Sequence, residues 1–328
     1  MAVLDGQDIT DLHDKRADGA LVRIGIGLAD WAERCFPDAF VIALLGLLVM
    51  FAAGVAIGTP LRDLVRYFGE RFWGLIPLTM QMALIVIGGF TVATSPPVHR
   101  LILTLADVPA TPKSAVVVAL FSMLSSMISW GFGLVMTGLL VRAIAGRVKR
   151  VDYRAIGAAG YLGLGTVRAL GLSSSPALYK MSGVIPLSET IYSWQSLTTA
   201  AVLIVVSTVI AYFSMPRRSH RTAESFGVRD DFAVTTLEPR RTWAEWLEYS
   251  PLLSILISAL GFAYLEQVMA ARGLRSAVDL NTFNFTLLMV GLLLHWRPRS
   301  FLRVVNQAVP ATASVLLQFP FYGGSSAS

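Results

Sequence analysis

The sequence predicts an all-α polytopic membrane protein. Of its 328 residues, 55% are hydrophobic and only 15% are charged, and the mean hydropathy is +0.63. A soluble domain of this size carries more charge. A helix needs ~20 apolar residues to cross a bilayer, and the uncharged runs of this chain therefore predict about seven to eight membrane segments.

The net charge of +6 does not indicate a nucleic-acid-binding protein. The Lys and Arg residues gather between the apolar runs without interleaved aromatic residues, which is typical of cytoplasmic loops. Cys35 is the single cysteine, and the four histidines are scattered without ligand spacing, so neither a disulfide nor a metal site is predicted. Because no acid pair and no nucleophile with a base is apparent, we expect no enzyme and no cofactor.

Residues 1–37 predict a cytoplasmic tail followed by an interfacial amphipathic helix. The first eighteen residues contain five aspartates and no apolar run, which is unlike a signal peptide. After them, apolar residues recur at helical spacing opposite charged ones, as in a helix that lies along a membrane surface. These apolar residues are Leu21, Ile24, Leu28, Trp31 and Cys35.

Residues 38–215 predict a first membrane half. Its apolar runs predict spans at 39–57, 72–94, 155–178 and 197–215, with loops at 61–71 and 98–113. Gln81 in the second span needs a polar partner, and the sequence leaves open whether that partner is another helix or a substrate. The glycine-rich 155–178 segment contains Arg168, which either faces a carboxylate or water or extends to the interface. The serines that follow, Ser173, Ser174 and Ser175, precede a proline and could bind an anion with freed amides.

The segment 114–140 is predicted to be a broken or re-entrant helical hairpin. It has no charge, and a straight helix of this length would exceed the ~30 Å hydrocarbon core, whereas two full spans would need about 40 residues. Near its middle the chain reads Ser129-Trp130-Gly131-Phe132-Gly133. Broken backbone at membrane depth is tolerated where it is buried or lines a wet cavity, so a solute site is expected here. The alternative is one tilted helix with small residues on its packing face.

Residues 216–249 predict a cytoplasmic linker, and 250–328 a partial second membrane half with spans at 251–268, 282–296 and 304–322. If every basic cluster is cytoplasmic, the span 282–296 runs inward. If 114–140 is also a hairpin that enters and leaves on one side, the N-terminus is cytoplasmic and the span 72–94 runs inward too. The span 304–322 runs outward and carries Gln318 before Phe319 and Pro320, an echo of Gln81. Similar breaks in opposite directions indicate an incomplete inverted repeat.

The chain resembles the short-chain fatty acid transporter family, the AtoE-like proteins, from Phe36 to Gly323. The resemblance rests on five motifs in the same order: Met80-Gln81-Met82-Ala83-Leu84, Trp130-Gly131-Phe132-Gly133-Leu134-Val135, Gly183-Val184-Ile185-Pro186, Gly291-Leu292-Leu293-Leu294-His295 and Gln318-Phe319-Pro320-Phe321-Tyr322-Gly323. It implies a multi-pass inner-membrane carrier of bacteria for short carboxylates such as acetoacetate and butyrate. The family is also thought to have inverted repeats and paired re-entrant hairpins.

Three departures from the family pattern qualify this resemblance. Ser129 stands where members usually have Asn, and the segment from Thr166 to Leu170 replaces an aromatic and glycine run. Family chains also continue past the last motif into a second glycine-rich hairpin. The alternative expectation is therefore a truncated membrane fragment that transports nothing.

The favoured hypothesis is a secondary transporter working by alternating access, coupled to protons or sodium, and a homo-oligomer is left open. A small monocarboxylate needs a few amide or hydroxyl donors and an apolar wall. The candidate substrate-binding residues are Gln81, Ser129, Trp130, Gly131, Phe132, Gly133, Arg168, Ser173, Ser174, Ser175 and Gln318. The serines and glycine amides are the expected donors, Arg168 the expected charge, and Trp130 and Phe132 the expected wall.

Overall fold

The computed structural model describes residues 20–107, 113–148, 151–171, 191–216, 222–227, 243–273 and 279–325. Within these ranges the chain is helical and forms no strand, in agreement with the predicted all-α class. Four of the described helices are long and apolar enough to cross a membrane: Ala39–Ala56, Leu61–Ala93, Trp194–Phe213 and Pro251–Arg272. This supports a multi-pass membrane protein, while the number of seven to eight segments and the inverted repeat stay predictions.

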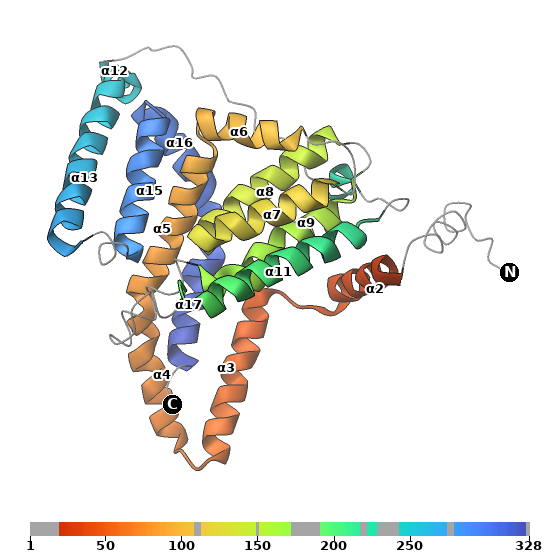
Figure 1. The fold of residues 1–328 in the computed structure, drawn as a ribbon. Coiled ribbons are helices and arrows are strands. Elements are labelled where there is room, and N and C mark those ends of the chain that lie inside the picture. The colour runs from red at the N-terminus through yellow and green to blue at the C-terminus, as the bar shows by residue number, and fades with distance from the viewer. Residues whose placement is uncertain are drawn as a thin grey trace.

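The N-terminal helices form a bent lead-in and a long hairpin (Figure 1). Helix α2 (Ala20–Cys35) is the predicted amphipathic helix, and α3 (Ala39–Ala56) begins where the Asp38 carboxylate accepts a hydrogen bond from Phe40 N at 2.8 Å. The chain then returns through α4 (Leu61–Phe72), the short turn η1 (Trp73–Leu75) and α5 (Ile76–Ala93). These three elements form one continuous apolar helix of 33 residues.

The predicted loop at 61–71 is therefore wrong. Its charged residues lie on one side of α4, and the apolar residues between them recur every three or four positions, as in an amphipathic helix. Phe68 and Phe72 pack against Phe321 of α17, with ring centroids 6.5 and 5.4 Å away. A partner helix distant in sequence thus stabilises α4, and the local charge pattern did not indicate that partner.

The predicted loop at 98–113 is also wrong in its first half, which belongs to α6 (Pro96–Ala106). The prolines stand in the first turn of this helix. Backbone N–H groups have no helix acceptor there, so the missing N–H of proline costs no hydrogen bond. Ile102 and Ala106 are fully buried in the core. The two prolines therefore begin a helix directly after the span that ends at Thr94.

Helices α7 (Lys113–Ile128), α8 (Trp130–Arg147), α9 (Tyr153–Leu162) and α11 (Trp194–Phe213) form one group. Helix α9 continues into the π-helical turn η2 (Gly163–Val167) and the turn η3 (Arg168–Leu170). In Figure 1 this group crosses a second group that contains α5, α13 (Pro251–Arg272) and α15 (Leu280–Leu294).

The C-terminal part continues through α16 (Pro298–Ala308), the turn η6 (Val309–Thr312) and α17 (Ala313–Ser325). The single span predicted at 304–322 is therefore two helices joined by a 3₁₀ turn that contains Pro310, which cannot donate a helix hydrogen bond. Two short elements, η5 (Ala223–Phe226) and α12 (Trp243–Tyr249), lie within the predicted linker.

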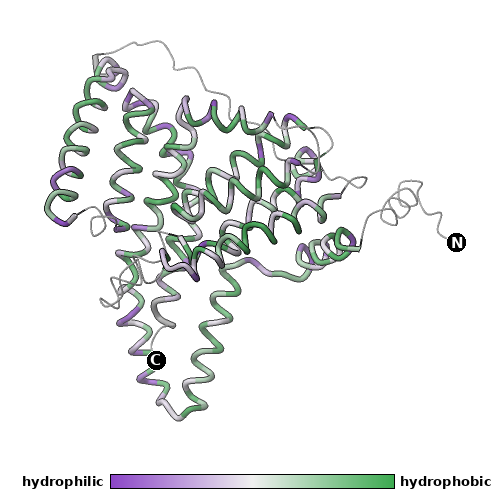
Figure 2. Tube along the Cα trace, in the orientation of Figure 1, coloured by the Kyte–Doolittle hydropathy of each residue, from purple (hydrophilic) through white to green (hydrophobic). Residues whose placement is uncertain are grey.

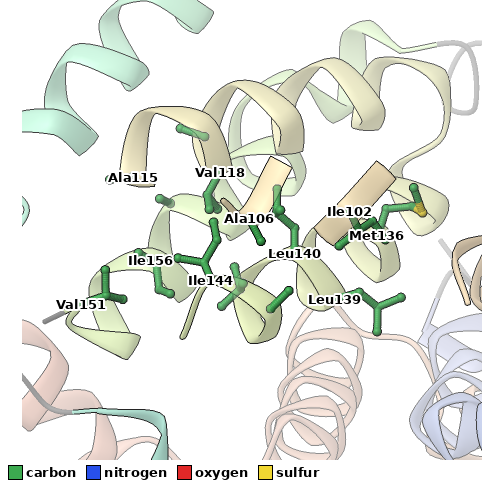
Figure 3. Packing of buried hydrophobic residues seen from close by; sticks show 14 of the residues in the cluster. Ile102, Ala106, Ala115, Val118, Met136, Leu139, Leu140, Ile144, Val151 and Ile156 are labelled. Atoms are coloured by element: carbon green, nitrogen blue, oxygen red, sulfur yellow. The ribbon is translucent and has the colours of Figure 1, made fainter. Parts of the chain in front are cut away.

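The main buried core lies where α6, α7, α8 and α9 meet (Figure 3). Ile102, Val118, Leu140, Ile144 and Ile156 contribute fully buried side chains from the four helices. By contrast, Ala43 is the only buried residue among the 18 residues of α3. Figure 2 shows hydrophobic residues along most of α3, which suits contact with lipid.

Helices α5 and α15 run parallel and pack closely along their length. Gly291 lies against Thr91, and His295 Nε2 lies 2.8 Å from the carbonyl oxygen of Thr91. Nearer their N-terminal ends, Asn284 Nδ2 donates to Gln81 O at 2.8 Å. The two helices were predicted to run in the same direction, and they do; that this direction is inward stays a prediction.

The contact between Gly291 and Thr91 predicts a stability effect. A Cβ built on Gly291 would meet Thr91 Oγ1 and lie 3.1 Å from Thr91 Cβ. We expect Gly291→Ala to lower the free energy of unfolding by about 1–3 kcal/mol, because an overpacked helix contact must separate. Thermal unfolding of the detergent-solubilised chain measures this. Gly46→Ala is the control, because Gly46 in α3 has nothing within 4 Å of the same position; equal effects of the two substitutions would contradict the close packing.

Candidate functional site

The predicted break in the 114–140 segment is present and lies at Ser129. Helix α7 ends at Ile128, α8 begins at Trp130, and Ser129 between them has an extended backbone with φ −155° and ψ 125°. Its Oγ accepts a hydrogen bond from Phe132 N at 3.5 Å. The two helices pack against each other as a hairpin, so the alternative of one tilted helix is wrong.

Glycines allow the tip of this hairpin to pack closely on its own first arm and on α5. A Cβ on Gly133 would lie 2.7 Å from Ser126 N, and one on Gly131 would meet the side chain of Ile85. A Cβ built on Gly89 of α5 would lie 3.2 Å from Phe132 Cα. Gly171 also packs closely on the hairpin, because a Cβ there would lie 2.8 Å from Ser126 O.

The π-helical turn η2 crosses the first arm of the hairpin at Ser122. The Ser122 hydroxyl donates to the carbonyl oxygen of Gly160 and accepts from Gly163 N at 3.0 Å. A Cβ on Gly163 would collide with Ser122 O and with Ser126 Oγ. A π turn leaves a backbone group without its usual helix partner, and here the serine supplies a partner from another helix.

Buried hydroxyl groups gather at this crossing. Ser122, Ser125, Ser126, Ser129 and Thr137 are all buried. Ser125 Oγ donates to Phe121 O at 2.6 Å, whereas Ser126 Oγ and Thr137 Oγ1 have no hydrogen-bond partner among the described residues. A hydroxyl can donate to an anion or accept from a cation or proton donor, so these two groups are available to a solute that enters.

Two of the predicted donors already form hydrogen bonds within the protein. The Gly133 amide donates to Ser129 O at 2.8 Å as part of helix α8. Gln81 Nε2 donates to Asn281 Oδ1 of α15 at 2.7 Å, so of the two partners that the sequence left open the helix partner is observed. Gln81 lies one helical turn before Ile85, which contacts the hairpin tip.

The remaining predicted residues fall in three places. Trp130 and Phe132 are half-buried at the hairpin tip, and Arg168 is exposed in η3, three residues before Gly171. Gln318 is half-buried in α17, whose main contacts are with α3, α4 and α5 and not with the hairpin. Ser173, Ser174 and Ser175 lie outside the described residues.

Comparison with known proteins identifies the family. The profile of the "Short chain fatty acid transporter" family matches residues 20–327. The chain belongs to this family. The resemblance inferred from the five motifs is thereby confirmed, and membership over this length does not favour an inert fragment.

Two curated relatives of this transporter family bear the same name, "Putative short-chain fatty acid transporter". The protein of Escherichia coli (strain K12) is 32% identical over 316 residues, which cover 92% of this chain and 71% of the relative. The protein of Haemophilus influenzae (strain ATCC 51907 / DSM 11121 / KW20 / Rd) is 30% identical over 322 residues, with the same coverage of 92% and 71%. No solved structure matches the chain.

Sequence reasoning missed the residues that connect the hairpin with η2. Ser122 and Ser126 lie four residues apart on one face of α7, which is a signal that could have found them. Thr137 and Gly163 gave no comparable signal, because their roles depend on the crossing of three helices that are separated in sequence.

The crossing predicts opposite outcomes for two glycines of the same segment. Gly163→Ala would push Ser122 O away, and we expect a loss of about 1–3 kcal/mol in the free energy of unfolding. Gly157→Ala places a methyl group where nothing lies within 4 Å, and we expect no loss or a gain of about 0.5–1 kcal/mol from helix propensity. Thermal unfolding of both purified variants tests this, and a stable Gly163→Ala protein would argue against the close crossing.

Proposed function

We propose that this chain is a secondary transporter that carries short-chain monocarboxylates, such as acetoacetate and butyrate, across the bacterial inner membrane by alternating access. The observation that carries the proposal is the broken hairpin. Its buried crossing contains two hydroxyls, those of Ser126 and Thr137, that have no hydrogen-bond partner within the described part of the chain. Family membership and the names of the two relatives support the substrate class.

The chemistry of the crossing suits a small carboxylate. Removing a carboxylate from water is costly unless hydrogen-bond donors replace its hydration shell. The hydroxyls of Ser126 and Thr137 can donate to it, and Trp130 and Phe132 offer an apolar surface for a short tail. A buried hydroxyl without a partner costs about 1–3 kcal/mol, which is recovered if a substrate supplies the partner in another state.

The crossing is closed in this structure, and we infer that opening it is the transport step. The space beside Gly133 and Gly163 is occupied by atoms of Ser126 and Ser122. A substrate can therefore reach Ser126 only if the hairpin and η2 move apart. Separation toward one side of the membrane and then toward the other would give alternating access.

Arg168 and the serines at 173–175 remain proposed contributors at the edge of this site. Arg168 is close in sequence to Gly171, which packs on the hairpin, and a guanidinium there would attract the anion.

The coupling ion is proposed to be a proton or sodium. In the topology that we propose, the N-terminal residues 1–37 and the linker 216–249 lie on the cytoplasmic side. Residues 38–215 and 250–328 form the two membrane halves.

Removal of one hydroxyl tests the proposed site. Ser126→Ala deletes an unpartnered group, so we expect unchanged or higher stability together with weaker substrate binding. A hydrogen bond to a charged group is worth about 1.5–3 kcal/mol, which corresponds to a rise of ~10- to 100-fold in KM. The measurement is uptake of labelled butyrate and acetoacetate by proteoliposomes, with an imposed proton or sodium gradient and without one.

The matched control is Ser114→Ala. Ser114 lies at the other end of α7 and is also buried with an unpartnered hydroxyl, so the two substitutions are chemically the same. We expect wild-type uptake from this variant. Equal loss in both variants, or equal retention, would place the site elsewhere. No saturable uptake by correctly folded wild-type protein would overturn the transporter proposal itself.

A further inference from the structure

Three amide side chains form a polar cluster in the contact between α5 and α15. Asn281 is exposed, Gln81 is half-buried, and Asn284 is only 3% exposed. Gln81 Nε2 donates to Asn281 Oδ1 at 2.7 Å, and Asn284 Nδ2 donates to Gln81 O at 2.8 Å. The cluster therefore leads from the surface into the buried contact between the two helices.

The innermost amide has an acceptor without a partner. Asn284 Oδ1 is buried and accepts no hydrogen bond from the described residues. The side-chain nitrogen of Asn284 must be the atom that faces Gln81 O, because two carbonyl oxygens would repel each other, and this leaves the oxygen unpaired. Gln81 brings a second side-chain oxygen, Oε1, to the same cluster.

These oxygens suit a monovalent cation. The oxygen of an amide is an acceptor that does not take up a proton near neutral pH, so Asn284 cannot bind a coupling proton. A buried divalent ion needs carboxylates to offset its charge. Within the described ranges, no group of three or more His, Cys, Asp or Glu side chains could hold a metal ion. Neutral oxygens can replace part of the water shell of an ion that carries one charge.

The N-terminal end of α15 carries a carboxylate close to this cluster. Asp279 Oδ1 accepts hydrogen bonds from Asn281 N and Thr282 N, each at 2.9 Å. Its charge offsets the positive end of the helix dipole, which would otherwise oppose a cation. Asp279 Oδ2 also lies 3.8 Å from Arg272 Nη1, but the Arg272 side chain is 60% exposed, and solvent screens such a pair.

We propose that Asn284 Oδ1 and Gln81 Oε1 bind one sodium ion between α5 and α15. Water from the exposed side of the cluster, at Asn281, completes the shell of the ion. Further along the two helices the contact is tight, because a Cβ on Gly88 would lie 2.8 Å from Leu287 Cβ. The ion therefore enters and leaves at the Asn281 end.

The position of the site gives sodium the role of coupling ion. Gln81 lies one helical turn before Ile85, whose side chain contacts Gly131 at the hairpin tip. A positive charge there attracts a carboxylate held at the crossing, so each ligand favours binding of the other. The coupling role rests on the proposed transport function, whereas binding of the ion can be measured without transport.

Thermal unfolding of the purified full-length chain in detergent tests the site. The chain is compared in sodium chloride, potassium chloride and choline chloride at equal ionic strength. An ion that binds only the folded chain stabilises it, and we expect sodium at roughly ten times its Kd to raise the Tm by about 2–5 °C over choline. We expect a smaller rise with potassium. Equal Tm values in the three salts would mean that water alone completes Asn284 and would overturn the site, and equal effects of sodium and potassium would overturn the assignment to sodium.

Two substitutions of Asn284 separate the loss of the oxygen from the loss of the hydrogen bond to Gln81. Asn284→Ala removes both, and we expect the Tm difference between sodium and choline to disappear. Asn284→Asp loses the amide nitrogen but keeps an oxygen, and we expect the difference to remain. A sodium effect that persists in Asn284→Ala, or that is lost in Asn284→Asp, would contradict the proposed ligand.

Ser254→Ala is the matched control. Ser254 in α13 is also buried, and its hydroxyl has no hydrogen-bond partner among the described residues. It lies one turn before Ser258, which donates to Met289 O, whereas later residues of α13 contact Phe285, so Ser254 is on the far side of this contact from Asn284. We expect the full sodium effect, and its loss would argue against a site at Asn284.

Uptake of labelled butyrate by proteoliposomes separates this inference from the transport proposal. Saturable uptake by a chain that sodium does not stabilise would support the transporter and overturn the sodium site. Stabilisation by sodium that depends on Asn284, without uptake by correctly folded protein, would support the site and overturn the transport proposal together with the coupling role.

Discussion

The structure depends on one constraint, which is that a broken helix at membrane depth must satisfy its backbone groups within the protein. Two breaks meet here, the hairpin turn at Ser129 and the π turn η2, and the hydroxyl of Ser122 bridges from α7 to the backbone of the α9–η2 segment. The glycines at 133 and 163 make this possible because they remove the Cβ atoms that would keep the segments apart. Each break is thus stabilised by the other.

The same packing connects the two groups of helices. The hairpin tip reaches α5 through Phe132 at Gly89 and through Gly131 at Ile85. Helix α5 is joined in turn to α15 by hydrogen bonds from Asn284 and Gln81 and by the contact of His295 with Thr91 O. Movement of the hairpin would therefore act first on α5 and, through α5, on α15.

Helix α9 connects the ion pairs beside α2 with the proposed transport site. Its first turn carries Arg154, which pairs with Asp30 of α2 and Asp152, and its last residues lead into η2 at the hairpin. The helix has only 10 residues, so a change at one end is close to the other.

The sequence by itself determined the membrane class, the amphipathic helix α2, the location of the break near Ser129 and the family. These follow from composition, from helical periodicity and from short motifs, all of which are local properties of the chain. Only the tertiary structure decided that residues 61–71 form one continuous helix with α5 and that Gln81 bonds to Asn281. It also decided that Ser126 and Thr137 are buried without hydrogen-bond partners among the described residues. Those facts arise from contacts between helices far apart in sequence, and no local pattern records which helices will meet.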